Sequence, residues 1–501
     1  MWFDAVFTSN NILLWILMVP LFSIIVIFFT SNLGNKFLYQ FSLISTMISF
    51  LLSLILWLWA FDQTQGDFQH IYSLMLIPST IIPVTFRLGV DGISLFFVIL
   101  TNIFIYLCIL SLNKHTHRLK EVLLHLLFLQ WGVLGSFLFL DLLGFFIFFE
   151  MTLIPIYFLV LIWGSRERRI RASYLISIYT LLGSIFMFFN ILYIFSKTGT
   201  TDYRLLLTII FTEEDQKFLW ITFFISFAAK IPLFPLHIWL PEAHVEAPTL
   251  GSVLLAVLLL KLGTYGLIRF SLPLFPEGTA FFGPLVSTFA VMGVIYTCLT
   301  AIRQIDLKKI IAYSSVGHMN VVLLGIMSGV VEGLEGAVFQ MLSHGVVSGA
   351  LFFAVGTIYE RYSVRSLKYF GGLTYFYPLF AIIFLIFSMA NISFPLTSSF
   401  IGEFLIFMGL FQYSFWATFF ASTSMVLGAV YTLWTYNRIF FGNIKVLSLV
   451  SFKDINRKEG ALFIVLIFML FLMGIFSYLI LDPMLLDCIN LLEHAKGGRI
   501  K

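Results

Sequence analysis

Four ionisable residues stand inside long apolar stretches of this sequence. They are Glu150 in LDLLGFFIFFEMTLIPIY, Lys230 in SFAAKIPLFPLHIWLPEAHVEAPT, Lys261 in LLKLGTYG and Glu403 in LTSSFIGEFLI. A charge in an apolar span costs about 3 kcal/mol or more, so such residues are functional candidates. Buried acids and amines that interact titrate as a set and can pass protons to one another. The set therefore predicts a proton path, and the alternative is a group of structural ion pairs.

Prolines close to two of these residues predict interrupted helices. Pro232 and Pro235 have no N–H, so they should release the carbonyls of Ala228 and Ile231 beside Lys230. Non-helical backbone at membrane depth persists only inside protein or beside a hydrated cavity, which would bring water to this lysine. Pro395 should interrupt the segment before Glu403 in the same way and free the carbonyl of Asn391, with hydroxyls at hand on Ser393, Thr397, Ser398 and Ser399. A plain packing kink is the alternative for both.

Five histidines fall in or near apolar stretches: His125, His237, His244, His318 and His344. A histidine can relay protons near neutral pH, but a lone helical histidine is as often a hydrogen-bonded core residue. The small and hydroxylated neighbours in AYSSVGHMN and MLSHGVVSG leave room for water, which favours His318 and His344. No two histidines repeat at a spacing that would hold a haem between two helices.

The composition places the chain in lipid. Of 501 residues, 60% are hydrophobic and only 11% are charged, against roughly a quarter charged in soluble domains. The net charge of +4 comes from short basic runs between apolar stretches, without the aromatic interleaving of a nucleic-acid surface. Cys108, Cys298 and Cys488 stand singly and far apart, which fits neither an iron–sulfur cluster nor a disulfide framework.

We predict an all-α integral membrane protein of about fourteen spans, because about 20 apolar residues cross the hydrocarbon layer. No strand and no nucleotide-binding GxGxxG motif is expected. The predicted spans cover residues 12–30, 38–60, 92–112, 120–138, 140–162, 171–195, 216–240, 249–271, 280–301, 308–330, 334–358, 376–410, 412–440 and 461–482.

The basic residues predict the orientation. Nineteen lysines and arginines fall after odd-numbered spans or at the adjoining end of a span, and eight fall on the opposite side. The remaining two are Lys230 and Lys261, inside spans. Because basic residues collect in cytoplasmic or matrix loops, we expect both termini on the outer face.

A weak internal repeat relates AKIPLFPL at 229–236 to ANISFPL at 390–396, with the shared FPL offset by 160 residues. The offset carries spans 4–8 onto spans 9–13, and an odd number of spans requires the second copy to be inverted. The predicted organisation is thus N-terminal spans 1–3 (1–112), two inverted five-helix halves (113–275 and 276–441) with spans 7 and 12 discontinuous, and a final span with tail (442–501).

Several segments resemble the antiporter-like membrane chains of NADH:ubiquinone oxidoreductase, respiratory complex I, whose relatives include subunits of cation/proton antiporters. The resemblance covers most of the chain. It lies in DGISLFFVILT at 91–101, then GSRERRIRASY, AKIPLFPLHIWLPEAHVEAPT, LLKLGTYGLIRF, RQIDLKKIIAYSSVGHMN, MLSHGVVSGALFF and SSFIGEFLI ending at 406.

The resemblance implies two half-channels joined by a polar axis. Glu150 and Lys230 match the family's coupled ion pair, Lys261 its central lysine and Glu403 the terminal group of the second half. An acid at 403 is typical of the chain 4 group, whereas sister chains tend to carry lysine there. The matched helix breaks are Pro232, Pro235 and Pro395, and His237, His318 and His344 match residues on or near the axis. Leu396 departs from the small residue that many relatives carry after the last of these prolines.

The function expected from the resemblance is proton translocation, coupled to electron transfer in other subunits. This chain would hold no cofactor and no metal, while NADH, FMN, iron–sulfur clusters and ubiquinone would belong to neighbouring subunits. Its partners would be other membrane-arm subunits, including sister antiporter-like chains, and lipids, but no nucleic acid. The expected location is the mitochondrial inner membrane, with the gene in the organelle, or alternatively a bacterial plasma membrane. The rival functions are a stand-alone cation/proton antiporter, a charge-stabilised scaffold and a haem-bearing quinol enzyme.

Overall fold

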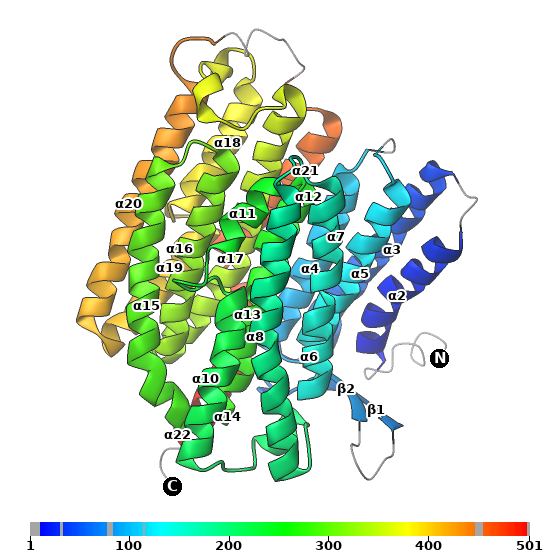
Figure 1. The fold of residues 1–501 in the computed structure, drawn as a ribbon, viewed down its shortest axis with the longest axis vertical. Helices are drawn as coiled ribbons and strands as arrows, with labels where there is room; N and C mark the ends of the chain where they lie inside the picture. Colours follow the sequence, from blue (N-terminus) through cyan, green and yellow to red (C-terminus); the bar gives the residue numbers. More distant parts are fainter. Residues whose placement is uncertain (1–10, 31–33, 78–83, 114–115, 446–453, 498–501) are drawn as a thin grey trace.

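A computed structural model describes residues 11–30, 34–77, 84–113, 116–445 and 454–497, which form a bundle of long helices with parallel or antiparallel axes (Figure 1). We call the end that carries the two strands the hairpin face, and the opposite end, where helices end at Arg303 and Tyr362, the basic face. Of the residues counted for orientation, Lys114, Lys453, Arg499 and Lys501 lie outside the described residues.

Among the described residues, twelve helices are long and apolar enough to cross a membrane, so the chain is a multi-pass membrane protein. Each coincides with a predicted span. The uninterrupted ones are α2 (Ile12–Phe29), α3 (Asn35–Ile55) with η1 (Leu56–Ala60), α4 (Gly92–Ser111), α5 (Leu119–Leu138), α8 (Arg169–Thr198), α15 (Pro276–Arg303), α16 (Leu307–Met327), α17 (Val331–Tyr362), α20 (Phe415–Phe440) and α21 (Arg457–Ile475).

The two remaining predicted spans are the ones expected to be discontinuous, and each is broken in the structure. The first consists of α10 (Glu213–Lys230) and α11 (Trp239–Glu246), and the second of α18 (Pro378–Asn391) and α19 (Ser398–Tyr413). In Figure 1, α10 starts near the lower end of the bundle and α18 near the upper end. The two breaks are therefore approached from opposite ends of the bundle, and the inverted repeat stays a prediction.

Two further spans are irregular. The span of Glu150 is divided at Thr152 into α6 (Leu142–Met151) and α7 (Leu153–Trp163). The span of Lys261 alternates α-helical and π-helical turns: α12 (Thr249–Leu254), η2 (Leu255–Leu259), α13 (Leu260–Gly266), η3 (Leu267–Ser271) and α14 (Leu272–Leu274). Its apolar core is entirely buried inside the protein. Such π-turns widen a helix locally and are common at functional sites.

The expectation of a chain without strands is wrong. In the connection that precedes α4, β1 (Gln69–Ile77) pairs antiparallel with β2 (Val84–Val90). Leu88 and Val90 on β2 are fully buried and belong to the hydrophobic core. Arg87 forms an ion pair with Asp202, just before the short helix α9 (Tyr203–Leu206). The hairpin thus covers the end of the bundle instead of crossing it.

The chain continues beyond the last predicted span. After α21, α22 (Tyr478–Gly497) packs against α4, α14 and α17, all of which have an end at the hairpin face. A single predicted span at 461–482 therefore joins two elements, because Phe476 leaves the helical conformation between them. Two 3₁₀ turns, η4 (Leu367–Tyr369) and η5 (Leu373–Tyr375), complete the basic face.

Glycines bring α17 and α19 into direct backbone contact. A Cβ at Gly409 would lie 2.5 Å from the nitrogen and 2.6 Å from the Cα of Gly333. Further along the interface, a Cβ at Gly402 would lie 2.6 Å from the Gln340 side-chain oxygen. Small residues at such positions let membrane helices approach closely. This contact sets the distance between the helices that carry His344 and Glu403.

We predict that Gly409→Ala destabilises the folded chain by about 1 to 3 kcal/mol, because its methyl group would meet backbone that cannot rotate away. The thermal unfolding midpoint of the purified assembly would measure the loss. Gly428→Ala is the matched control, since the nearest atom to its Cβ would be the Tyr431 hydroxyl at 3.9 Å. Equal midpoints for the two variants would contradict the prediction.

Candidate functional site

The first candidate pair lies where α6 meets the end of α10. The Lys230 ammonium is 3.7 Å from Glu150 Oε1, donates a 2.7 Å hydrogen bond to the Phe149 carbonyl and lies over the Phe149 ring. Among the described residues, neither carboxylate oxygen of Glu150 accepts a hydrogen bond, although both are buried. The pair is thus an ion pair without a direct hydrogen bond, which a small movement of either helix can open or close.

The break beside Lys230 has its own hydrogen bonds. The Trp239 indole N–H donates to the Ala229 carbonyl at 2.8 Å, and the Leu233 N–H donates to Ala228 at 3.3 Å. Ala228, predicted to lose its helical donor, therefore finds another one in the next turn. Because each carbonyl in the break needs a partner, the first residue of α11 fixes the position of the last turn of α10.

A continuous chain of polar contacts joins the other two candidates. The Lys261 ammonium donates 2.5 Å to the Ala256 carbonyl and lies 2.8 Å from His344 Nδ1. The His344 and His318 rings are 5.8 Å apart between centroids, and His318 Nδ1 lies 2.8 Å from Glu403 Oε1. The contacts cross from α13 to α17, α16 and α19. Lys261 is fully buried, and His344 and Glu403 are each 3% exposed.

Glu403 has two further neighbours. The Gln340 side-chain amide donates to its Oε1 at 3.2 Å. On the side of α20, a cavity of about 10 Å³ lies beside Glu403, and its wall includes His318, Asn391 and Tyr431. This volume is about that of one water molecule. The carboxylate therefore faces both the chain of histidines and a polar space at the second helix break.

The hydroxyls predicted to satisfy the second break divide into three groups. Thr397 donates to the Phe394 carbonyl at 2.6 Å, and Ser399 donates to Ala390, so both serve loose backbone groups. Ser398 instead bonds Ser343 on α17 at 2.9 Å. The buried Ser393 hydroxyl has no hydrogen-bond partner among the described residues. Leu396, the residue that departs from its relatives, adopts a left-handed φ of 74°.

The structure thus brings six of the seven predicted titratable residues into two groups, Glu150 with Lys230, and Lys261 with His344, His318 and Glu403. In the described part of the chain, no hydrogen bond joins Lys230 to Lys261. The two helices nevertheless touch, since a Cβ at Gly263 would lie 3.0 Å from the Phe227 carbonyl. The interval between the groups coincides with the first helix break.

His237 lies outside both groups. Its ring contacts Phe234 and Tyr296, and the buried Nδ1 has no partner among the described residues. His244 is the residue that sequence reasoning undervalued. Its fully buried ring stacks on Phe352 at 4.7 Å, with both nitrogens unpartnered in the described chain. Its position two residues before Glu246, in the last turn of α11, was the available signal.

Lys308 lies at the start of α16, on the side of the axis that faces the basic face. Its ammonium is 2% exposed and donates to the Ala247 carbonyl at 2.7 Å and to the Ser252 hydroxyl at 3.1 Å. Ser252 also donates a 3.0 Å hydrogen bond to the His244 carbonyl, so Lys308 and His244 share this serine. Within the described residues no group of three or more His, Cys, Asp and Glu side chains forms a metal site.

Comparison with known proteins defines the class. Residues 140–428 match the protein family described as NADH:quinone oxidoreductase/Mrp antiporter, TM, and the chain belongs to this family. It is 47% identical to NADH-ubiquinone oxidoreductase chain 4 of Marchantia polymorpha over 98% of this chain and 99% of that protein. It is 48% identical to the chain 4 of Arabidopsis thaliana over 96% and 97% of the two chains. The resemblance of the sequence motifs to chain 4 is confirmed.

Two solved structures share the fold. A chain in respiratory complex I from Thermus thermophilus with bound NADH is 29% identical and superposes with a TM-score of 0.85, covering 97% of this chain and 100% of that one. A chain of the membrane-bound sulfane sulfur reductase, an archaeal respiratory membrane complex, also gives a TM-score of 0.85 over 98% and 99% of the two chains. At 20% identity the second likeness concerns the fold alone.

We predict that Trp239→Phe lowers the stability of the α10–α11 break by about 1 to 3 kcal/mol, because it leaves the buried Ala229 carbonyl without its donor. Thermal unfolding of the purified assembly measures the change. Trp131→Phe is the matched control, since the buried Trp131 N–H has no partner among the described residues. A smaller loss in Trp239→Phe than in the control would show that the indole does not hold the break.

Proposed function

We propose that this chain is a proton-translocating membrane-arm subunit of an NADH:ubiquinone oxidoreductase. The observation that carries the proposal is the buried chain of contacts from Lys261 through His344 and His318 to Glu403. The Lys261–His344 and His318–Glu403 steps are at hydrogen-bond distance, and the two histidine rings between them are 5.8 Å apart between centroids. Support for the particular enzyme comes from the relatives named NADH-ubiquinone oxidoreductase chain 4.

The Glu150–Lys230 pair would couple this chain to its neighbours. With Glu150 close, electrostatic attraction holds the proton on Lys230. Withdrawal of the carboxylate removes that attraction, and the proton moves across the helix break toward Lys261. The transfer over this interval would use water admitted where α10 and α11 separate. His237 and His244, both buried near the break or the central lysine, are the further relay candidates.

The two halves would divide the path between them. Residues 113–275 contain the pair and the central lysine, and residues 276–441 contain His318, His344 and Glu403. The energy would come from electron transfer in other subunits, which would hold NADH, FMN, iron–sulfur clusters and ubiquinone. The proposed partners are the other membrane-arm subunits, including sister antiporter-like chains. The proposed location is the mitochondrial inner membrane.

We predict that Lys230→Ala and Glu403→Ala each lower NADH-driven proton pumping by about tenfold or more while the complex still assembles, because a positioned proton-transfer group contributes about 10² or more to such a step. Pumping is measured as acidification of sealed vesicles beside the rate of NADH oxidation. The matched control is Lys217→Ala on the same α10, where the lysine pairs with exposed Glu213 at 2.6 Å. Undiminished pumping in both buried variants would refute the proposal.

The alternative function is a stand-alone cation/proton antiporter. Vesicles that contain the purified chain would then exchange Na⁺ for H⁺ without NADH, whereas the proposed subunit should not. Neutral replacements of the four residues distinguish proton transfer from a purely structural role of the buried charges. The residues are Glu150, Lys230, Lys261 and Glu403. If these charges only hold helices together, the pumping per NADH oxidised should stay unchanged in every variant that assembles.

A further inference from the structure

A second buried charge cluster lies at the hairpin face, outside the axis described above. The Arg269 guanidinium on η3 forms an ion pair with Asp91, which precedes α4. Asp487 on α22 is the third charged member, and the hydroxyls of Tyr203 and Tyr265 complete the cluster. All five residues are at most 4% exposed. The cluster therefore holds two carboxylates and one guanidinium away from water.

The two carboxylates are not equivalent. Asp91 takes the direct contact with Arg269 and also accepts the Ser94 N–H at 2.9 Å, which caps α4. Within the described residues, Asp487 accepts one hydrogen bond, from the Gly92 N–H at 2.6 Å. One guanidinium cannot neutralise two buried carboxylates. Two ionised carboxylates buried beside one cation repel each other, which favours a proton on one of them.

Charge and burial act together on Asp487. Burial and the neighbouring Asp91 raise the pKa of Asp487 to about 8, against the opposing effects of the Gly92 N–H and Arg269. The charge of Asp67, in the connection before β1, also raises the pKa of Asp487. Burial and the charge of Glu335 on α17 raise the pKa of the Cys488 thiol, which is next to Asp487 in the sequence. The bound proton should therefore be retained near neutral pH and leave as the pH rises through about 8.

The cluster is connected to the central lysine along one helix face. Tyr265 follows Lys261 by four residues, and Arg269 follows Tyr265 by four, so the three lie in one row. The Tyr265 hydroxyl donates to the Phe137 carbonyl at 3.2 Å and accepts from Arg269 Nε at 3.3 Å. The row leads from the polar axis to the hairpin face, two turns away.

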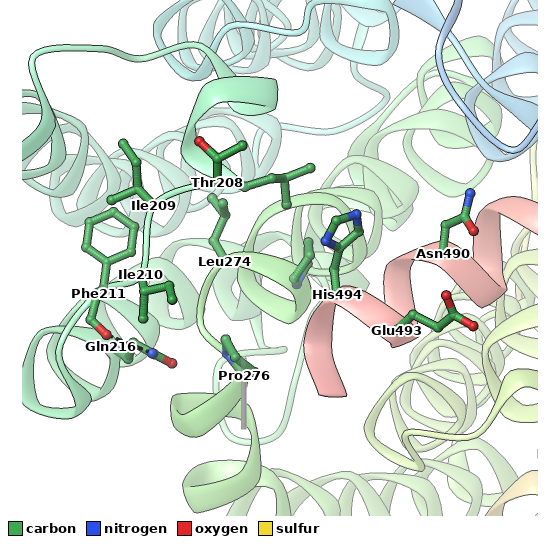
Figure 2. Close-up of a pocket in the computed structure, with 12 residues that line it drawn as sticks. Thr208, Ile209, Ile210, Phe211, Gln216, Leu274, Pro276, Asn490, Glu493 and His494 are labelled. Carbon is green, nitrogen blue, oxygen red and sulfur yellow. Dashed lines mark hydrogen bonds between the residues drawn. The ribbon is translucent and has the colours of Figure 1, made fainter. Parts of the chain in front are cut away.

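A surface cavity lies one helical turn beyond three residues of the cluster. Leu207, Pro273 and Asn490 follow Tyr203, Arg269 and Asp487 by three or four residues, and all three line a cavity of about 400 Å³. Figure 2 shows this cavity between α22, the segment after α9 and the start of α15. Thr208 and Glu493 on its rim are exposed. The buried Tyr203 hydroxyl, in the cluster beneath, has no standard hydrogen-bond partner among the described residues.

We propose that the Asp91–Asp487 pair is a proton-binding site that exchanges its proton with the aqueous phase through the cavity beside α22. It serves as the terminus of a branch that runs from Lys261 past Tyr265 and Arg269. This role rests on the proposed proton translocation. Since the hairpin face carries the fewer basic residues, the branch opens on the outer side of the membrane.

The test compares Asp487→Asn with Asp482→Asn in the assembled complex. Asparagine keeps an oxygen for the Gly92 N–H but cannot release a proton, so a purely structural clamp would survive this change. We expect Asp487→Asn to lower NADH-driven pumping by roughly tenfold or more, because a positioned proton-transfer group contributes about 10² or more to such a step. The exposed Asp482 lies on the same helix, and its variant should pump as the parent does.

Infrared difference spectra give an independent readout. The parent complex should show a protonated carboxyl band that shifts in D₂O, fades above about pH 8 and is missing from Asp487→Asn. A band unchanged in this variant would overturn the assignment of the proton to the pair. So would undiminished pumping in Asp487→Asn.

A third variant covers the case in which Asp487→Asn does not assemble. Thr208→Trp places a bulky ring in the cavity without changing either carboxylate, and it should slow pumping, because it obstructs the route through which a positioned group exchanges protons. Thr288→Trp on α15 is its control, since both threonines are exposed and donate 2.7 Å to the carbonyl three residues earlier. Equal pumping in the two tryptophan variants would overturn the inference.

The same measurements separate this inference from the proposed function. If Lys230→Ala loses pumping while Asp487→Asn and Thr208→Trp keep it, the axis stands and the branch at the hairpin face does not. If Lys230→Ala and Glu403→Ala pump normally, the proposed function itself fails, whatever the behaviour of the cluster.

Discussion

The cost of placing charge in a lipid-embedded protein governs this structure. A lysine or carboxylate inside such a bundle must find a partner within the protein, because the surrounding hydrocarbon offers none. Lys230, Lys261 and Glu403 each have only a few polar contacts, which come from backbone carbonyls, the Glu150 carboxylate, two histidines and an amide. None is enclosed by a full set of fixed counter-charges. Such sparse pairing keeps the groups buried and still lets a proton leave.

The helix breaks supply these partners at a defined depth. Where α10 and α18 end, backbone carbonyls become available, and tryptophan and hydroxyl side chains from the next segment bond them. The glycine contacts between α17 and α19 then set how closely the two sides of the axis approach. Backbone irregularity and close packing are thus two parts of one arrangement. The first provides polar groups, and the second fixes the distance over which they act.

The sequence allowed prediction of the spans, the two breaks and the buried ionisable residues, because hydropathy, proline and charge act locally. It did not indicate the strands or the separate α22, since both depend on covering the ends of other helices. The partners were also out of reach: that His344 lies between Lys261 and His318 is a tertiary fact. Trp239 had no signal beyond its place after the prolines, and the π-turns around Lys261 have none in composition.

The position of Lys261 unites these observations. Its helix is, like α17, a completely buried span, and it has π-turns on both sides of the lysine. It contacts α17 through His344, faces the α10 break through Gly263 and continues by single turns to Tyr265 and Arg269. A proton on this lysine therefore has neighbours in three directions. Because one ammonium holds only one proton at a time, the field of the surrounding charges must decide which neighbour receives it.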